Sequence, residues 1–377
     1  MAKVTAFGAS LLLLSGAASV AAPVIDVRAI PARPYIEQRG DSRSVNADLI
    51  VRNNGAVALK LAVIREQLFD AHGKLELERE VNANGNPPAL AAMGDLVVPA
   101  HGIADFYQPF DRHDAALDLS RIRLSLVFLD AGKPVPPIAL TGDAIATIDL
   151  YPRRFLPASY CLPLAGRLLV HDGHDFASHH RRRNLAAAFA SDPATALNTN
   201  LYAYDFVRID EQGRLYHGDM DRKENWLTFG ALVKAPTSGT IVAAVDGVPD
   251  NNLSAGKPVI PPAAEAIDPG GFGNHVVLRG EDGRVSWLLH MEAGSIRVHA
   301  GQRVGRGDAL GRIGFSGDAL FPHLHYTVTS GATYPAQGVP SYFGHFVRLL
   351  GTRHIQVGYG QIDTGDIVAA EAHGRCS

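Results

Sequence analysis

Short runs of alternating apolar and polar residues, separated by turn-forming residues, recur along the first 150 residues and constrain the fold of this part most strongly. The clearest runs span residues 47–51, 59–64, 122–129 and 144–150. Such spacing by Gly, Pro, Asn and Asp is typical of a β-sandwich. The turn Asn53–Gly55 lies between the first two runs and predicts a hairpin. We therefore expect an N-terminal β-sandwich domain over residues 22–150.

The second half of the chain predicts a separate, mainly β domain. A segment with three prolines, residues 151–163, reads as a linker, so we place this domain at residues 151–377. With 377 residues, 46% of them hydrophobic, the chain is long enough for two cores. Only one stretch here, 184–190, predicts a helix. Strands are expected at 202–209, 239–245, 275–279, 285–290 and 324–329.

The first residues have the features of a secretory signal peptide. Lys3 precedes an apolar run through Leu14, and small residues follow up to Ala22. We expect cleavage after Ala21, so that residues 1–21 are removed and the protein is periplasmic or secreted. An uncleaved anchor is the alternative, but the apolar run is shorter than the roughly 20 residues that a spanning helix needs. No later stretch predicts a membrane span.

The net charge limits which binding partners are expected, and the cysteine content bears on the redox compartment of the protein. The formal net charge of -3 gives no basic field, so neither nucleic acid nor an anionic lipid surface is expected as a partner. The two cysteines, Cys161 and Cys376, lie near the two ends of the second domain. In an oxidising compartment they are expected to pair. Two unrelated free thiols are the alternative.

Two histidines that stand two residues apart are the strongest chemical signal. His323 and His325 lie in a β-like run, where residues i and i+2 face the same side. One imidazole of such a pair can bind a metal ion while the other acts on water. Upstream, the run 285–290 ends in His290. Between these elements, residues 298–313 (VHAGQRVGRGDALGRI) predict a tight hairpin with glycines at its turns.

The order of these elements over residues 170–331 resembles the lysostaphin/LytM type of zinc metallopeptidase, peptidase family M23. The resemblance implies an antiparallel-β domain that binds one catalytic zinc ion. It implies that His325 is a zinc ligand and that His323 and His290 are catalytic, as general base and transition-state stabiliser. The expected function is an exported endopeptidase that cleaves peptide cross-links of peptidoglycan.

The other two zinc ligands are assigned by the same resemblance. Asp205 lies in an aromatic run, where a carboxylate is costly unless it is paired or bound to metal. Family members commonly carry a histidine four residues before this aspartate, but Leu201 stands there. The segment 177–183 (ASHHRRR) resembles a variant in which a histidine-rich stretch supplies the ligand, and we choose His180. The alternatives are His179, His174 and His217.

Other readings of these patterns remain open. The glycine pattern of residues 298–313 also occurs in biotinyl and lipoyl carrier domains, but those need a lysine at a hairpin tip, and none stands here. A LytM-type domain without catalysis, which regulates a cell-wall hydrolase, is one rival function. A peptidase that acts on proteins is another. Two long segments, 211–229 and 246–271, either wall a substrate groove or are solvated excursions.

Overall fold

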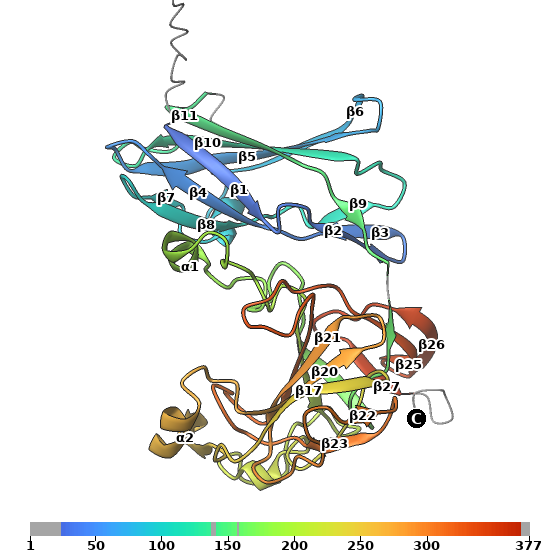
Figure 1. Cartoon of the computed structure of the whole chain (residues 1–377). Coiled ribbons are helices and arrows are strands. Elements are labelled where there is room, and N and C mark those ends of the chain that lie inside the picture. The colour runs from blue at the N-terminus through green and yellow to red at the C-terminus, as the bar shows by residue number, and fades with distance from the viewer. Residues whose placement is uncertain (1–23, 137–140, 157, 371–377) are drawn as a thin grey trace, which may run out of the picture.

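The computed structural model describes residues 24–136, 141–156 and 158–370 of the chain and confirms the mainly β class (Figure 1). Helices are short in this part of the chain, in keeping with the turn-rich sequence. The helix predicted at residues 184–190 is confirmed as α1. The helical elements are η1 (Ala89–Met93), α1 (Ala186–Ser191), η2 (Lys223–Asn225) and α2 (Pro262–Ile267).

Two antiparallel sheets form most of the amino-terminal part, which Figure 1 shows above the carboxyl-terminal part. Apolar side chains of both sheets, such as Leu49, Leu61 and Leu124, are fully buried in one hydrophobic cluster. Every second side chain of these strands points into the core, which explains the alternating apolar and polar residues of the sequence. In sheet order the strands are β1 (Ile25–Ile30), β4 (Asp48–Asn53), β8 (Ile103–Tyr107); and β11 (Ala144–Leu150), β10 (Arg121–Asp130), β5 (Leu59–Phe69), β6 (Leu75–Asn82), with β7 (Val97–Val98) beside β5.

The hairpin predicted at the turn Asn53–Gly55 is wrong. Strands β4 and β5, on either side of this turn, belong to different sheets. The Asn53 amide donates hydrogen bonds to the carbonyl oxygens of Val57 (2.8 Å) and Pro99 (3.1 Å), and its Oδ1 accepts one from the Gly55 N–H (2.9 Å). These bonds tie the turn to the loop after β7, so the chain crosses from one sheet to the other.

The predicted linker over residues 151–163 contains two short strands instead of being free of pairing. Strand β12 (Arg153–Arg154) adds to a small sheet of β2 (Tyr35–Arg39), β3 (Ser42–Val45) and β9 (Arg112–Asp114). Strand β13 (Ser159–Tyr160) pairs with β25 (Tyr342–Leu350) of the carboxyl-terminal part. The connection therefore extends one sheet on each side of the junction.

One large sheet organises the carboxyl-terminal part and places three predicted strands side by side at its centre. Strands β15 (Tyr204–Arg208), β24 (Leu324–Thr329) and β21 (Val285–Met291) are neighbours, and their aromatic residues Phe206 and Tyr326 belong to the buried core of this part. In sheet order the strands are β13, β25, β27 (Ile367–Ala370), β14 (Arg167–Asp172), β15 (Tyr204–Arg208), β24 (Leu324–Thr329), β21 (Val285–Met291), β20 (Asn274–Gly280), β17 (Gly239–Val245) and β22 (Arg303–Val304), with β26 (Arg353–Gly360) beside β25.

Residues 298–313 do turn tightly, but they do not form the predicted hairpin. Strand β22 pairs with β17, and β23 (Ala309–Arg312) pairs with β16 (Leu232–Lys234). The two arms of the turn thus join two different sheets. A further small pair, β18 (Asn252–Ser254) and β19 (Lys257–Val259), lies within the long segment 246–271.

Two sequence-based predictions concern residues outside the described ranges. Residues 1–21, the expected signal peptide, belong to these. Cys376 does as well, so its pairing with the buried Cys161 stays a prediction. Among the helices within the described ranges, none is long and apolar enough to cross a membrane.

The segment that precedes β15 is held by the amino-terminal part. The Asn198 amide donates to Asp48 Oδ2 (3.0 Å), and the Leu185 N–H donates to Asp105 Oδ2 (2.7 Å). Helix α1 lies beneath β8 in Figure 1. An apolar cluster joins the two parts at the same place. Its buried members are Ile30, Ile50, Leu185, Phe189 and Ala196.

The two carboxyl groups at this junction predict a pH-dependent stability. Burial raises the pKa of Asp48 to about 7, and burial together with Asp48 raises the pKa of Asp105 to about 8. Between about pH 4 and pH 8 the folded chain therefore binds more protons than the unfolded chain, so the free energy of unfolding falls as pH rises. We expect a decrease of at least about 1 kcal/mol from pH 6 to pH 9 in denaturant titrations.

The variant Asp105→Asn provides the control for this prediction. Its amide oxygen still accepts the Leu185 N–H, but it cannot ionise. We expect the decrease between pH 6 and pH 9 to become smaller in this variant. An unchanged decrease would assign the pH dependence to other groups.

Candidate metal centre and active site

The central strands bring four of the predicted site residues to one cavity. Asp205 of β15 and Leu289 of β21 both stand opposite His325 of β24. His323 immediately precedes β24, and His290 lies near the end of β21. The cavity has a volume of about 610 Å³, and Asp205, His290, His323 and His325 all line it. The i, i+2 spacing of the histidine pair is therefore used as the sequence predicts.

His180 approaches the same group of side chains from the segment between β14 and β15. Its ring is buried, and Nδ1 donates a hydrogen bond to the carbonyl oxygen of Gly173 (2.9 Å). Because Nδ1 carries the proton, Nε2 presents a lone pair. Nε2 lies 3.4 Å from Asp205 Oδ1 and has no hydrogen-bond partner in the described part of the chain.

The carboxylate of Asp205 is the centre of the cluster. Its Oδ1 lies 3.0 Å from His325 Nδ1 and 3.4 Å from His323 Nε2. All three side chains are buried. His323 Nδ1 donates to the carbonyl oxygen of Phe321 (2.8 Å), so its Nε2 also presents a lone pair toward the cluster.

His290 is held in an unusual backbone conformation. Its φ is 63°, in the left-handed region that a residue with a side chain rarely adopts, and such positions concentrate at functional sites. Its Nδ1 donates to the carbonyl oxygen of Ser316 (2.8 Å). The loop of Ser316 approaches so closely that a Cβ on Gly273 would lie 2.5 Å from Ser316 Oγ. Glycine at 273 thus permits the contact that orients His290.

The electrostatics of the cluster differ from those of isolated side chains. Burial alone would raise the pKa of Asp205, but its electrostatic interactions and hydrogen bonds with His323 and His180 outweigh burial and hold this pKa well below its usual range. Burial, with the neighbouring His323, lowers the pKa of His290 well below its usual value. Burial also lowers the pKa of His325 to about 4. Burial would likewise lower the pKa of His323, but the neighbouring Asp205 outweighs it and raises this pKa. The site therefore favours an ionised Asp205 carboxylate beside neutral His290 and His325.

The three alternative histidines differ in their surroundings. The side chain of His179 is 70% exposed, its Nδ1 contacts Asp172, and its Nε2 lies 3.9 Å from Asp205 Oδ2. His174 is buried away from Asp205, against Glu37 (3.0 Å). His217 is half-exposed and pairs with Asp210 (3.6 Å). Of these three only His179 shares the cluster with Asp205.

Sequence reasoning missed Asp172. Its carboxylate contacts His179 and lies 3.2 Å from His180 Nδ1. The potential ligand atoms of Asp172, His179, His180 and Asp205 all lie within 4.8 Å of one another. An aspartate only five residues before the histidine-rich segment 177–183 was the available signal.

The two long segments contribute unequally to the cavity. Gly270 and Gly271 of the segment 246–271 line it. The segment 211–229 supplies no lining residue, but its Trp226 stacks on Phe321 of the cavity wall at 5.6 Å between ring centroids. Sequence reasoning also missed the aromatic pair Phe272 and Tyr334, whose ring centroids lie 4.8 Å apart at the cavity.

The donor set fits one zinc ion. His180 Nε2 is a buried nitrogen with a lone pair and no partner, and it faces an ionised carboxylate. His325 Nδ1 lies 3.0 Å from the same Asp205 oxygen, Oδ1. Two imidazole nitrogens and one carboxylate oxygen are ligands that zinc takes in catalytic sites, with further positions left for water and substrate.

The residue after His180 anchors this donor to the amino-terminal part. The Arg181 side chain is fully buried, and its Nη1 donates to Asn46 Oδ1. We expect Arg181→Ala to lower the free energy of unfolding by about 2–4 kcal/mol, since it leaves a cavity and an unpaired amide. We also expect zinc affinity to fall by about 10-fold or more, because partners that orient a ligand contribute this much.

Chelator competition measures that affinity, and Arg303→Ala is the matched control. The Arg303 side chain is 76% exposed and pairs only with Glu281 at 3.6 Å in the described residues. Removing it should change neither quantity. Full zinc affinity in Arg181→Ala would show that the contact with Asn46 does not position His180.

Comparisons with known proteins find sequence similarity over the part of the chain that carries three of the site histidines. Residues 227–337, which contain His290, His323 and His325, match the sequence profile of peptidase family M23. An uncharacterized metalloprotease of Haemophilus influenzae is 37% identical over 82 residues, which are 20% of this chain and 17% of that protein. The match thus spans about a sixth of the length of that curated relative.

Solved structures of similar proteins include three peptidases. The catalytic domain of lysostaphin from Staphylococcus simulans is 22% identical, with 34% of this chain and 86% of that chain covered and a TM-score of 0.21. The deep-sea M23 metalloprotease pseudoalterin is 14% identical, with 53% and 95% covered and a TM-score of 0.28. A peptidase M23 from Pseudomonas aeruginosa is 16% identical, with 71% and 86% covered and a TM-score of 0.23.

The family is assigned on residues 227–337, which begin after His180 and Asp205. This region includes the histidine pair of β24 and the histidine at the end of β21. Over residues 227–337 the chain therefore matches peptidase family M23, a family of metallopeptidases.

Proposed function

We propose that this protein is an exported zinc endopeptidase that cleaves peptide cross-links of peptidoglycan in the periplasm or outside the cell. The observation that carries the proposal is the convergence of His180 Nε2 and His325 Nδ1 on Asp205 Oδ1, at 3.4 and 3.0 Å, beside the cavity that His290 and His323 line. Export is supported by the composition of the first 21 residues.

In this proposal His180, Asp205 and His325 hold the metal. His180 is preferred to His179 because its ring is buried and its tautomer is fixed by Gly173, whereas the side chain of His179 is 70% exposed. Burial and a fixed tautomer keep the lone pair aimed at the metal. When bound, zinc supplies Lewis-acid catalysis, in that it polarises the scissile carbonyl and acidifies water.

His290 and His323 are the proposed proton-transfer groups. Each donates Nδ1–H to a backbone carbonyl, Ser316 for His290 and Phe321 for His323, both at 2.8 Å. Each Nε2 is then free to accept a proton from the attacking water and to deliver it to the leaving amine. The ring that holds the proton also carries a positive charge, which stabilises negative charge on the carbonyl oxygen. Their ring centroids are 4.9 Å apart, so both reach one reacting group.

The cavity gives the peptide a place to bind. Phe272 and Tyr334 offer ring faces, and Leu320 at the rim is 65% exposed. A cavity of about 610 Å³ is within the size range of sites that take small ligands or a few residues of a peptide. The substrate class comes from the resemblance of the motifs to wall peptidases.

Digestion of purified cross-linked muropeptides tests the proposal. The zinc-loaded full chain should convert dimers into monomers, with one new amino and one new carboxyl terminus per cut detected by mass spectrometry. Denatured casein, offered in parallel, should be cut far more slowly. If casein is cut and muropeptides are not, the enzyme is a protein peptidase. If neither is cut, the non-catalytic regulatory reading replaces ours.

A further inference from the structure

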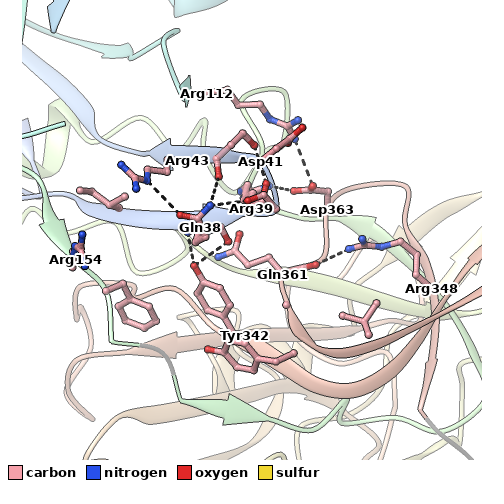
Figure 2. A pocket seen from close by; sticks show the side chains of 17 residues that line it. Gln38, Arg39, Asp41, Arg43, Arg112, Arg154, Tyr342, Arg348, Gln361 and Asp363 are labelled. Atoms are coloured by element: carbon pink, nitrogen blue, oxygen red, sulfur yellow. Dashed lines mark hydrogen bonds and ion pairs between the residues drawn. The ribbon is translucent and has the colours of Figure 1, made fainter. Parts of the chain in front are cut away.

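A second cavity lies at the junction of the two parts, apart from the histidines that line the cavity of Asp205. Its volume is about 730 Å³, and it shares no lining residue with the cavity of Asp205. Strands β2, β3, β9 and β12 contribute one wall, and β25 and β26 contribute the other. Figure 2 shows their side chains converging on the space between these strands. Cavities of this size bind small ligands.

Arginine dominates the charged lining of this cavity. Five arginines line it, against two aspartates, Asp41 and Asp363. Asp363 is shared, since it contacts Arg39 and lies 3.5 Å from Arg112. The arginines are Arg39, Arg43, Arg112, Arg154 and Arg348. Because the whole chain has a net charge of -3, this concentration of guanidinium groups is a local feature.

Two of these arginines form no short ion pair with any of the described residues. Arg43 donates to Gln38 Oε1 (3.3 Å) and to the Leu117 carbonyl oxygen (2.9 Å), which are both neutral acceptors. Within the described ranges no carboxylate lies within 4.0 Å of Arg43 or Arg154. The Arg39 side chain is only 7% exposed, and its Nε has no hydrogen-bond partner among the described residues. Arg39 itself is already paired with Glu37 (3.2 Å) and with Asp363. The charges of Arg43 and Arg154, which no close carboxylate of the described residues neutralises, therefore remain available to an anion.

Aromatic rings form the apolar side of the cavity. Tyr342 stacks on Tyr359 with ring centroids 5.2 Å apart and planes 9° apart, and it stacks on Phe155 at 5.9 Å. The Tyr342 hydroxyl accepts a hydrogen bond from the Gln38 N–H (2.7 Å), which fixes the stack against β2. Tyr359 at its end is 43% exposed. The cavity thus combines free guanidinium groups with an accessible ring face.

We propose that this junction cavity binds the carboxylate-bearing stem peptide of peptidoglycan at a second site, separate from the site of cleavage. Guanidinium groups pair with carboxylates in a bidentate manner, and a stem peptide presents several carboxylates on a short chain. The stacked rings accommodate its apolar methyl groups or the attached sugar. The inference rests on the proposed function, because that function supplies the ligand.

Calorimetric titration of the full chain with a soluble muramyl tripeptide, which ends in diaminopimelate, tests this site. We expect Arg43→Gln with Arg154→Gln to weaken binding at least about 10-fold, as each loss removes charge-assisted hydrogen bonds. Amidation of the peptide carboxylates should have a similar effect. Arg303→Gln, at an exposed position on the far strand β22, should bind like the unaltered chain.

Two results would overturn the inference. One is equal affinity of the double variant and the unaltered chain, which would place the peptide elsewhere. The other is inorganic phosphate that binds as tightly as the tripeptide, which would show a general oxyanion site. Muropeptide digestion by the same double variant separates the two proposals. If the double variant cleaves muropeptides and binds the tripeptide as tightly as the unaltered chain, only the second site is contradicted. If the two arginines are needed for tripeptide binding but neither protein cleaves muropeptides, only the proposed function is contradicted.

Discussion

Replacing His323 with alanine is expected to slow muropeptide cleavage by about 10²–10⁴-fold while one zinc ion stays bound. His323 presents its Nε2 lone pair beside Asp205, 3.4 Å from Oδ1, and its Nδ1–H is fixed by the Phe321 carbonyl oxygen. The variant removes the proposed proton acceptor and leaves His180, Asp205 and His325 in place. The variant should therefore have a lower kcat and an unchanged zinc content.

The measurement compares steady-state cleavage of a cross-linked muropeptide with zinc content for each variant. His299→Ala is the control, because His299 is exposed and hydrogen-bonds only locally, to Ala300 (3.0 Å). It should keep both activity and zinc. Full activity in His323→Ala would remove this residue from the mechanism. Loss of zinc in His323→Ala would make it a ligand instead.

Replacing His180 with alanine is expected to weaken zinc binding by at least about 10²-fold and to abolish cleavage. A three-ligand site loses one donor, and the remaining two ligands bind zinc far more weakly. His179→Ala should keep zinc, because its side chain is 70% exposed and its Nδ1 is engaged by Asp172. The two neighbours form a matched pair, since they differ in burial and not in residue type.

Chelator competition gives both zinc affinities, and thermal unfolding supports them. Zinc bound to the folded chain raises the unfolding temperature, so this rise should disappear in His180→Ala and persist in His179→Ala. The reverse pattern would assign the metal to the cluster of Asp172, His179 and Asp205, and our choice of His180 would then be wrong.

Much of the fold followed from local sequence pattern. Strands β11, β17 and β24 begin and end where the alternating runs predict. The hairpins were predicted less well, because pairing partners are set by contacts distant in sequence. Asn53 illustrates this, since its amide bonds to the carbonyl oxygen of Pro99, and that contact sends the chain into the other sheet. No local pattern at the turn contained this information.

The site was predictable where its geometry is local. The spacing of His323 and His325 within one strand placed both rings on one face, and the aromatic context singled out Asp205. The attachment of the histidine-rich segment to the amino-terminal part was not predictable. It depends on Arg181 reaching Asn46, which lies 135 residues away in the sequence. Asp172 was missed for a similar reason, since only the sheet brings it opposite Asp205.

The most direct test of the account is zinc content and muropeptide cleavage measured together for the unaltered chain and for His325→Ala. His325 Nδ1 lies 3.0 Å from Asp205 Oδ1, so its loss should empty the proposed metal centre. We predict one zinc ion per unaltered chain with cleavage of cross-linked dimers, and neither in His325→Ala. An unaltered chain that binds one zinc ion and leaves every cross-linked muropeptide intact would contradict the account.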